Sequence, residues 1–242
     1  MASTCPLRVM SDEATFKVVL FYKYFQLSEK AQTDLMVMLR QVCEEKHLLG
    51  RILIAEEGIN GTLAGSADSI DEFILLFNEH IQCGVIDWKF SIHRGKENPF
   101  LDISIRRVKE IVGTGDARDM IASIIRYDTN SFGGICGTGK HLNAVDFHQA
   151  LNNDDKSKIV FDIRNQFEYD IGHFDGSISL GTYTYAETFS ALDKSLEMLN
   201  QKDLLCSNIY MYCTGGIRCE KASAYLCSKG FRNVYQVTRC LG

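Results

Sequence analysis

The sequence predicts two domains of different class, an α+β domain followed by a parallel α/β domain. Strand-like and helix-like segments alternate in different orders in the two halves of the chain, and a glycine-rich stretch separates the halves. The chain has 242 residues, of which 45% are hydrophobic and 24% are charged, which is ordinary globular content and permits a sizeable core. We therefore place the first domain at residues 15–111, a linker at 112–141 and the second domain at 142–242.

The first domain is predicted to be ferredoxin-like, with the order βαββαβ, a four-stranded antiparallel sheet and two helices on one face. β-branched and aromatic residues mark its first strand, and Ser28 caps a helix with apolar side chains at helical spacing. The step Asn60-Gly61 predicts a hairpin turn between two short apolar strands. The predicted strands cover residues 15–25, 50–55, 61–64, 85–92 and 101–111, and the helices cover residues 28–47 and the segment that begins at Ser66.

The second half alternates short apolar strands with helical segments, which predicts a parallel sheet covered by helices. Asn143 caps its first short helix, which runs to Leu151. The strands are expected at residues 159–162, 177–180, 209–212 and 234–236, and the further helices at 167–171, 187–199 and 220–229. Between the two domains the periodicity fails and glycines cluster, so we expect a partly extended connection along the surface.

The segment after residue 208 predicts an activated cysteine. The strand 209–212 would deliver Cys213 to the carboxyl edge of the sheet, and the next helix would point its amino terminus at the sulfur. Arg218 adds a permanent positive charge, and such surroundings lower a thiol pKa from about 8.5 toward roughly 3.5 to 7.5. The backbone that could surround an anion belongs to Thr214, Gly215, Gly216, Ile217 and Arg218. The alternative is a buried, inert cysteine beside a glycine turn.

This loop, together with the segments 161–165 and 168–177, resembles the rhodanese homology domain. The resemblance implies that Cys213 is the active-site cysteine, able to carry a persulfide, and that Asp162 and Arg164 support the loop. For His173 a role as a base is one interpretation, and a structural histidine before a turn is the favoured one. Cys219 is either a resolving thiol or a small residue of the first helical turn, and the second interpretation is preferred slightly.

Over about residues 16 to 236 the chain resembles the tRNA uridine hydroxylase family. The resemblance implies an acylphosphatase-like first domain, a rhodanese domain with an essential Cys213, and oxygen-dependent conversion of the wobble uridine of certain tRNAs to 5-hydroxyuridine. It implies tRNA as partner and molecular oxygen as co-substrate without a bound cofactor, and it leaves the electron source and the oligomeric state open. The segments that carry it are Phe21-Tyr22-Lys23-Tyr24-Phe25, Gly50-Arg51-Ile52, residues 55–62, Arg164-Asn165 with Glu168-Tyr169, and residues 211–223.

Two other functions stay open. A sulfurtransferase that moves sulfane sulfur from thiosulfate to an acceptor needs only Cys213 and its loop. A catalytically silent binding or regulatory protein is favoured by the carboxyl terminus: after Gln236 the family continues with a Gly-Gly-Ile segment and a further helix, whereas this chain ends at Gly242. We therefore expect the second domain to be truncated.

Composition limits the cellular location and the kinds of site that we expect. No secretory start and no apolar run of membrane-spanning length are present, so we expect a cytoplasmic protein that does not enter a membrane. The nine cysteines are scattered and odd in number, which argues against a disulfide framework and against a metal site. A net charge of −5 does not indicate a nucleic-acid binder, but residues 87–109 hold six bases against three acids. Candidate RNA contacts are Lys23, Arg51, Arg94 and the bases of residues 89–109, with Tyr22 and Tyr24 either stacking on bases or packing in the core.

Overall fold

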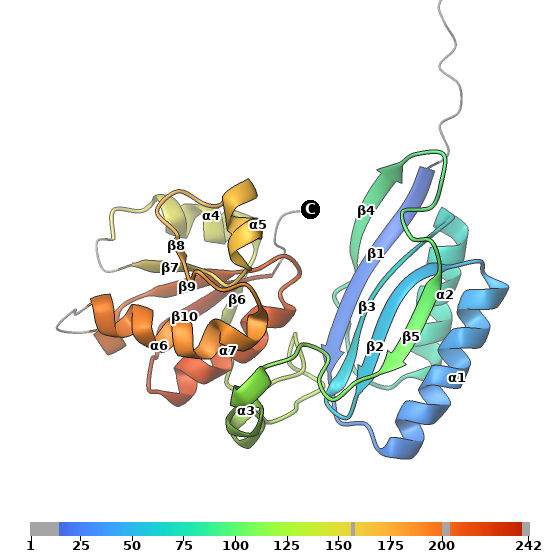
Figure 1. The fold of residues 1–242 in the computed structure, drawn as a ribbon, viewed down its shortest axis with the longest axis horizontal. Coiled ribbons are helices and arrows are strands. Elements are labelled where there is room, and N and C mark those ends of the chain that lie inside the picture. The colour runs from blue at the N-terminus through green and yellow to red at the C-terminus, as the bar shows by residue number, and fades with distance from the viewer. Residues whose placement is uncertain (1–14, 156–157, 200–203, 239–242) are drawn as a thin grey trace, which may run out of the picture.

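The computed structural model describes residues 15–155, 158–199 and 204–238, and each of its two domains is built on a five-stranded sheet (Figure 1). The expectations about the start of the chain and about its end after residue 238 lie outside these residues. Within the described ranges, no helix is long and apolar enough to cross a membrane.

The first domain has the predicted ferredoxin-like class. Helices α1 and α2 cover one face of its sheet, whose strand order is β4-β1-β3-β2-β5 (Figure 1). Its core centres on an aromatic cluster in which the rings of Phe21 and Trp88 lie 5.0 Å apart. The elements are β1 (Thr15–Tyr24), α1 (Glu29–Glu45), β2 (Leu49–Ala55), β3 (Gly58–Gly65), α2 (Ala67–His80), β4 (Lys89–Arg94) and β5 (Ile103–Arg107).

Two details of this domain differ from the prediction. The sheet is mixed rather than four-stranded and antiparallel, because the loop after β4 carries the chain to the opposite edge, where β5 pairs parallel to β2. Asn98 anchors that loop by donating to the carbonyl of Ala64 at 3.0 Å.

The hairpin turn also lies elsewhere. Glu56 and Glu57 form it, and Gly58, with φ of +139°, opposes Ala55 across it. Asn60 and Gly61 lie inside β3, where a methyl group on Gly61 would stand 2.6 Å from the Phe21 ring. Gly61 therefore makes room for the core rather than for a turn.

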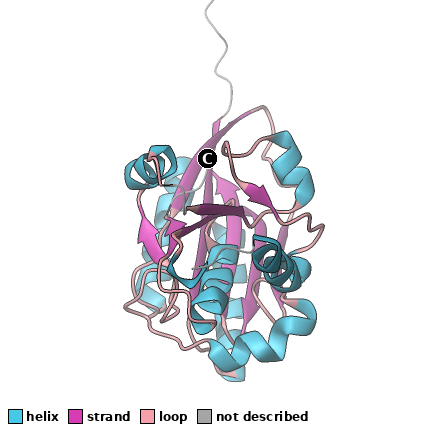
Figure 2. Ribbon diagram, turned by 90° about the vertical axis from the view of Figure 1, so that its left-hand side faces the viewer, coloured by secondary structure: helices cyan, strands magenta, loops and turns pink. Residues whose placement is uncertain are grey.

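The second domain is the predicted parallel α/β unit, with strand order β6-β10-β9-β7-β8. The inner strands β7 and β9 are buried along their whole length, as expected of strands in a parallel sheet that is covered on both faces. Figure 2 shows the molecule from the side of this domain, with helices in cyan and strands in magenta. The elements are β6 (Lys140–Leu142), α4 (Ala144–Asn152), β7 (Ile159–Asp162), α5 (Gln166–Ile171), β8 (Ile178–Ser179), α6 (Thr188–Leu199), β9 (Ile209–Tyr212), α7 (Ile217–Ser228) and β10 (Val234–Val237).

The segment 112–141 is more ordered than an extended surface connection. It contains the short helix α3 (Arg118–Ile124), and its end forms β6, the edge strand of the second sheet. Ile121, Ile125 and Ile135 are buried in the core of the second domain, so the prediction of a surface path is wrong for this part. Ile121 and Ile125 lie at helical spacing, but α3 has only seven residues and turns separate it from Ile135, so the sequence shows no sustained period.

The two domains share a core. Tyr22, Tyr24 and Ala55 of the first domain belong to the same buried cluster as the side chains of β7, β9 and α7. The segment before β6 returns to β1, where the backbone N–H of Tyr24 donates to the carbonyl of Gly133 at 3.0 Å. The carboxyl end of β1 therefore lies against the second domain.

Candidate active site

Cys213 follows β9 directly, and its side chain is only 1% exposed. Gly216 adopts φ of +89°, which turns the chain and starts α7 at Ile217, three residues before the predicted start at Glu220. The backbone N–H of Gly216 donates to Sγ of Cys213 at 3.1 Å. Hydrogen bonding from the backbone N–H groups of Arg218 and Cys219 also lowers the pKa of this thiol. The first turn of α7 thus forms an anion cradle around Cys213.

This cradle favours the thiolate. Burial raises the pKa of Cys213, but a hydrogen bond from the Cys219 side chain, the charge of Arg218 and the two backbone N–H groups outweigh it, and the pKa falls to about 6. The thiolate is then the main form at neutral pH, which is the form that acts as a nucleophile. Cys219 is itself buried, so its contact with the Cys213 sulfur is internal to the cradle.

Arg218 lies in a closed set of hydrogen bonds beside the sulfur. Its guanidinium donates to both carboxylate oxygens of Glu168, at 2.7 and 2.9 Å, and to Oγ1 of Thr214 at 2.8 Å. The Thr214 hydroxyl in turn donates to Glu168 at 2.7 Å. Although burial alone would raise it, these bonds hold the pKa of Glu168 at about 2. Arg218 therefore keeps a fixed place from which its charge acts on Cys213.

Glu168 is not among the site residues that the sequence predicts, and it belongs only to the motif Glu168-Tyr169 that carries the family resemblance. Its carboxylate also accepts from the backbone N–H of Asn165 at 3.1 Å, so it completes the capping box of α5. The spacing Asn165-x-x-Glu168 was the available signal, but it indicates a helix start and says nothing of Arg218.

Asp162 and Arg164 lie at the end of β7, beside the strand that delivers Cys213. The Arg164 guanidinium donates to the buried carboxylate of Asp162 at 2.7 Å and to the carbonyl of Gly172 at 2.6 Å. It also lies over the ring of Tyr212, 5.3 Å from the ring centre. These contacts reach the residue before Cys213 and support the framework under the loop.

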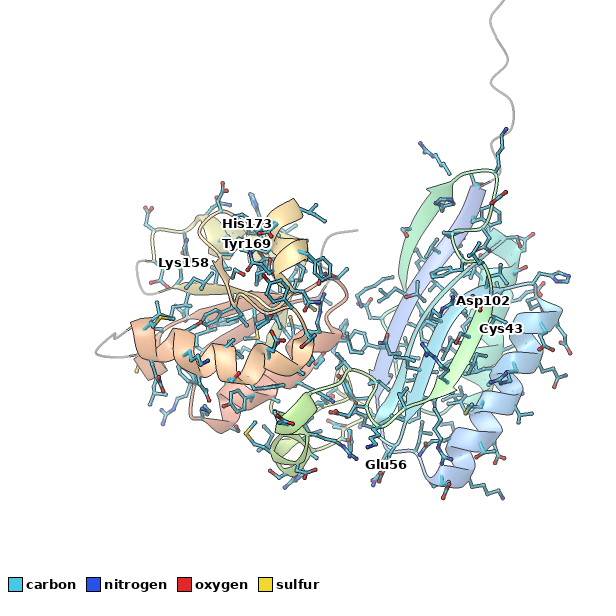
Figure 3. All side chains as sticks on the ribbon, viewed as in Figure 1. Cys43, Glu56, Asp102, Lys158, Tyr169 and His173 are labelled. Atoms are coloured by element: carbon cyan, nitrogen blue, oxygen red, sulfur yellow. The ribbon has the colours of Figure 1, made fainter. Side chains whose placement is uncertain are left out.

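His173 is exposed, lies two residues past the end of α5 and contacts Tyr169 of that helix. Its Nδ1 lies 3.0 Å from the carbonyl oxygen of Tyr169, and the two rings stack with centres 3.7 Å apart (Figure 3). This arrangement is that of a structural histidine at the end of α5.

Several expected RNA contacts are contradicted. Lys23 is fully buried, and its ammonium donates to the carbonyls of Val85, Ser131 and Phe132, so it cannot meet a phosphate. Tyr22 and Tyr24 are buried between the domains, so the stacking interpretation is wrong and the core interpretation holds. Arg51 and Arg107 pair with Asp102 and Glu29, but their side chains stay 43% and 39% exposed, so no contact excludes them. Lys89 pairs with Asp87 and is largely shielded. Arg94, Lys96, Arg106 and Lys109 are exposed.

Comparison with known proteins agrees with this two-part architecture. The family described as UPF0176 acylphosphatase like domain matches residues 16–111, and the rhodanese-like domain matches residues 143–239. Among solved structures, a rhodanese-related protein from Thermoplasma volcanium is 25% identical over 40% of this chain and 82% of its own, with a TM-score of 0.29. An acylphosphatase from Coxiella burnetii is 14% identical over 40% of this chain and all of its own, with a TM-score of 0.30. Scores this low support no further inference.

Curated relatives align with both domains at once. A protein named tRNA uridine(34) hydroxylase from Bacillus velezensis is 32% identical over 93% of this chain and 63% of its own length. Proteins of the same name from Staphylococcus epidermidis and Prochlorococcus marinus are 34% and 32% identical over 92% of this chain and over 62% and 66% of their own lengths. The chain thus spans less than two thirds of these relatives. With both domains matched in order, the chain carries a UPF0176 acylphosphatase-like domain followed by a rhodanese-like domain, and over most of its length it is similar to these proteins named tRNA uridine(34) hydroxylase.

Proposed function

We propose that this protein hydroxylates C5 of the wobble uridine of tRNA, with Cys213 as nucleophile and molecular oxygen as co-substrate. The observation that carries the proposal is the Cys213 sulfur, which is buried at a strand end and accepts a hydrogen bond from the backbone N–H of Gly216. Its surroundings lower the pKa of the thiol to about 6. The relatives' name supplies the reaction and the substrate. A cytoplasmic location belongs to the same proposal, because tRNA is the partner.

The chemistry starts from the Cys213 thiolate, which adds to C6 of the uracil ring and moves an electron pair to C5. Oxygen then reacts at C5 and, with one proton, gives a hydroperoxide. An external donor supplies two electrons, and two further protons are taken up, which cleave the O–O bond and release water. Loss of the C5 proton and of the thiolate from C6 restores the ring double bond. The N–H groups and Arg218 stabilise the thiolate as it leaves.

The residues around the Cys213 loop determine from which side a substrate base can reach the sulfur. Leu20 and Tyr22 of β1 cover one side of the loop, since a methyl group on Gly215 would lie 3.0 Å from Leu20 and one on Gly216 would lie 2.8 Å from the Tyr22 hydroxyl. Thr214 is the exposed residue of the loop. We therefore place the entry of the extruded base on the Thr214 side. Unstacking that base costs a few kcal/mol, and the exposed bases Arg94, Lys96, Arg106 and Lys109 are available for the phosphate contacts that offset it.

The test is nucleoside analysis of tRNA from a bacterial strain that lacks its own uridine-34 hydroxylase. Expression of this chain should restore 5-hydroxyuridine, and Cys213→Ser should not. Cys227→Ser is the matched control, because Cys227 lies later in α7 and its pKa is raised by burial alone. The proposal would be contradicted if Cys213→Ser restored 5-hydroxyuridine, or if the unchanged chain failed to restore it.

A sulfurtransferase is the second candidate, because N–H groups that hold a thiolate also suit the terminal sulfur of a persulfide. The purified protein distinguishes the two when it is incubated with thiosulfate and cyanide. Thiocyanate formation that depends on Cys213, together with unchanged tRNA, would favour sulfur transfer over hydroxylation.

A further inference from the structure

We infer that Tyr22 and Tyr24 of the first domain are positioning residues for the Cys213 thiolate, because their hydroxyls hold the helical turn that binds the sulfur. The inference rests on Cys213 as the reactive residue of the proposed function and does not depend on the substrate. By this inference, the acylphosphatase-like domain positions the active-site loop of the rhodanese-like domain.

Tyr22 touches the first turn of α7 at two points. Its hydroxyl lies against Gly216, where a methyl group would stand only 2.8 Å away. The N–H of that same Gly216 donates to Sγ of Cys213 at 3.1 Å. Four residues further on, the Tyr22 hydroxyl donates to Oε1 of Glu220 at 3.0 Å. In sequence, the two contacts lie on either side of Arg218 and Cys219, whose backbone N–H groups help to lower the pKa of Cys213.

Tyr24 holds the turn between those two points. Its hydroxyl donates to the carbonyl of Ile217 at 3.2 Å, and Tyr185 of the second domain donates to the next carbonyl, that of Arg218, at 2.7 Å. Burial raises the pKa of all three phenols well above the ordinary value, so each keeps its proton and remains a donor. The rings of Tyr22 and Tyr24 pack edge to face with centres 6.1 Å apart, which fixes the two hydroxyls relative to each other.

Glu220, which accepts the hydrogen bond of Tyr22, is itself held by other contacts. Glu220 is 0% exposed, and its carboxylate also contacts Nε2 of His141 at 2.9 Å and accepts from Gln236 at 3.2 Å. Gly133 lies so close that a methyl group there would stand 2.0 Å from Oε1 of Glu220. Hydrogen bonds to a buried carboxylate are stronger than those between neutral groups, so Tyr22 is held firmly.

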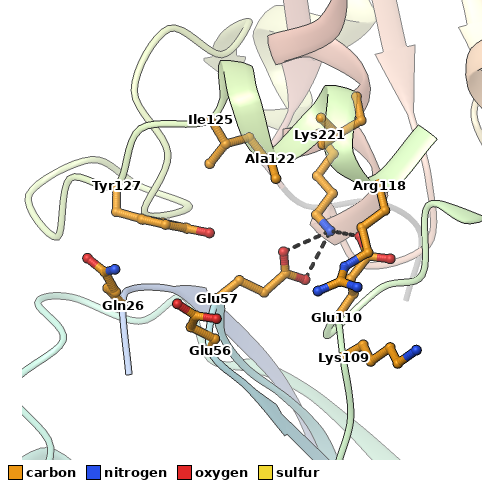
Figure 4. A pocket seen from close by; sticks show the side chains of 11 residues that line it. Gln26, Glu56, Glu57, Lys109, Glu110, Arg118, Ala122, Ile125, Tyr127 and Lys221 are labelled. Carbon is orange, nitrogen blue, oxygen red and sulfur yellow. Dashed lines mark hydrogen bonds and ion pairs between the residues drawn. The ribbon is translucent and has the colours of Figure 1, made fainter. Parts of the chain in front are cut away.

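Lys221, which follows Glu220 in α7, makes a second set of contacts between this helix and the first domain. Lys221 donates to Glu57 and Glu110, each at 2.9 Å, and to the carbonyl of Val112 at 3.1 Å, at one end of a pocket between the domains (Figure 4). Glu57 comes from the turn between β2 and β3 of the first domain. Two adjacent residues of α7 therefore bind two different parts of the first domain, and the cradle cannot shift along the interface without breaking both contacts.

The test is the pH dependence of Cys213 alkylation by iodoacetamide in the full chain, followed on the Cys213 peptide by tandem mass spectrometry. Tyr22→Phe and Tyr24→Phe each remove one hydroxyl and keep the ring. Loss of one hydrogen bond to the cradle should raise the midpoint of the profile by about 0.5 pH unit in either variant. Tyr225→Phe is the matched control, because Tyr225 is a buried tyrosine of α7 whose hydroxyl donates to Asp193 instead. Its midpoint should equal that of the wild type.

Midpoints equal to the wild type in both variants would overturn the inference, and so would an equal rise in Tyr225→Phe, which would indicate general loosening. If one variant fails to fold, the other decides by the same criterion. A wild-type midpoint at the ordinary thiol value would count against activation of Cys213, and hence against the proposed function, independently of the tyrosine variants.

Discussion

The helix that binds the Cys213 sulfur is held differently on its two sides. On the outer side, Arg218 and Glu168 both come from the second domain, and their side chains are 14% and 21% exposed. On the inner side, Glu220 and Lys221 are 0% and 1% exposed, and their partners include Tyr22, Glu57 and Glu110 of the first domain. The outer contacts supply charge next to the sulfur, whereas the inner contacts supply position. Charges that are fully buried cost far more to leave unpaired than charges that water can reach.

The largest expected effect is that of Lys221→Met, which leaves Glu57 and Glu110 in the interface without their cation. The free energy of unfolding should fall by about 3 to 5 kcal/mol, as measured by urea denaturation. Lys229→Met is the control on the same helix, since Lys229 and its partner Asp193 are 40% and 36% exposed. It should lose less than about 1 kcal/mol. Similar losses in the two variants would remove the distinction between the inner and outer sides.

Arg218→Ala should act on the sulfur more than on stability. Without the guanidinium, the midpoint of Cys213 alkylation should rise by about one pH unit, because a neighbouring cation is what favours the thiolate. Arg107→Ala, which breaks a pair with Glu29 in the first domain, should leave the midpoint unchanged. Collapse of thermal stability in Arg218→Ala, with normal reactivity of Cys213 in the folded remainder, would show that Arg218 is structural.

The hydrogen bonds of Glu168 predict that stability falls at acidic pH. The pKa of Glu168 in the folded chain is about 2, below the ordinary value of about 4.3. Its contribution to stability is therefore complete above the ordinary value and is lost as the pH falls toward the folded value. The difference in thermal midpoint between the wild type and Glu168→Gln should narrow as the pH falls from 5 to about 2. A difference that stays constant would exclude ionised Glu168 as the source.

Cys219 gives the smallest expected effect. Cys219→Ala removes a hydrogen bond to the Cys213 sulfur and should raise the alkylation midpoint by less than Arg218→Ala does. Cys219→Ser keeps a donor in the same place and should stay near the wild type. Iodoacetamide should label Cys219 more slowly than Cys213 in the native chain; equal labelling of both would contradict the assignment of Cys213 as the reactive thiol.

On the outer side, the sequence predicts Arg218 but not its partner Glu168, which lies 50 residues away, and it predicts none of the inner contacts. The strand, Cys213, the glycines and Arg218 follow one another within ten residues, so their local chemistry predicts the cradle. Tyr22 and Glu220 are 198 residues apart, and nothing in a single sequence pairs them. Lys23 also depends on contacts that are distant in sequence. A lysine in an aromatic strand suggests an exposed base, yet Lys23 is buried and its ammonium donates to three backbone carbonyls from other parts of the chain. Strand patterns likewise predicted β5 but not the edge it joins.

The most direct measurement is the pH profile of Cys213 alkylation in the unchanged full chain. Tandem mass spectrometry reads it on the Cys213 peptide, because Cys136 and Cys206 are exposed and are expected to be alkylated as well. The cradle built by α7, Arg218 and the two domains predicts a midpoint near pH 6. A midpoint at about 8.5, the value of an ordinary thiol, would contradict an activated thiolate at Cys213.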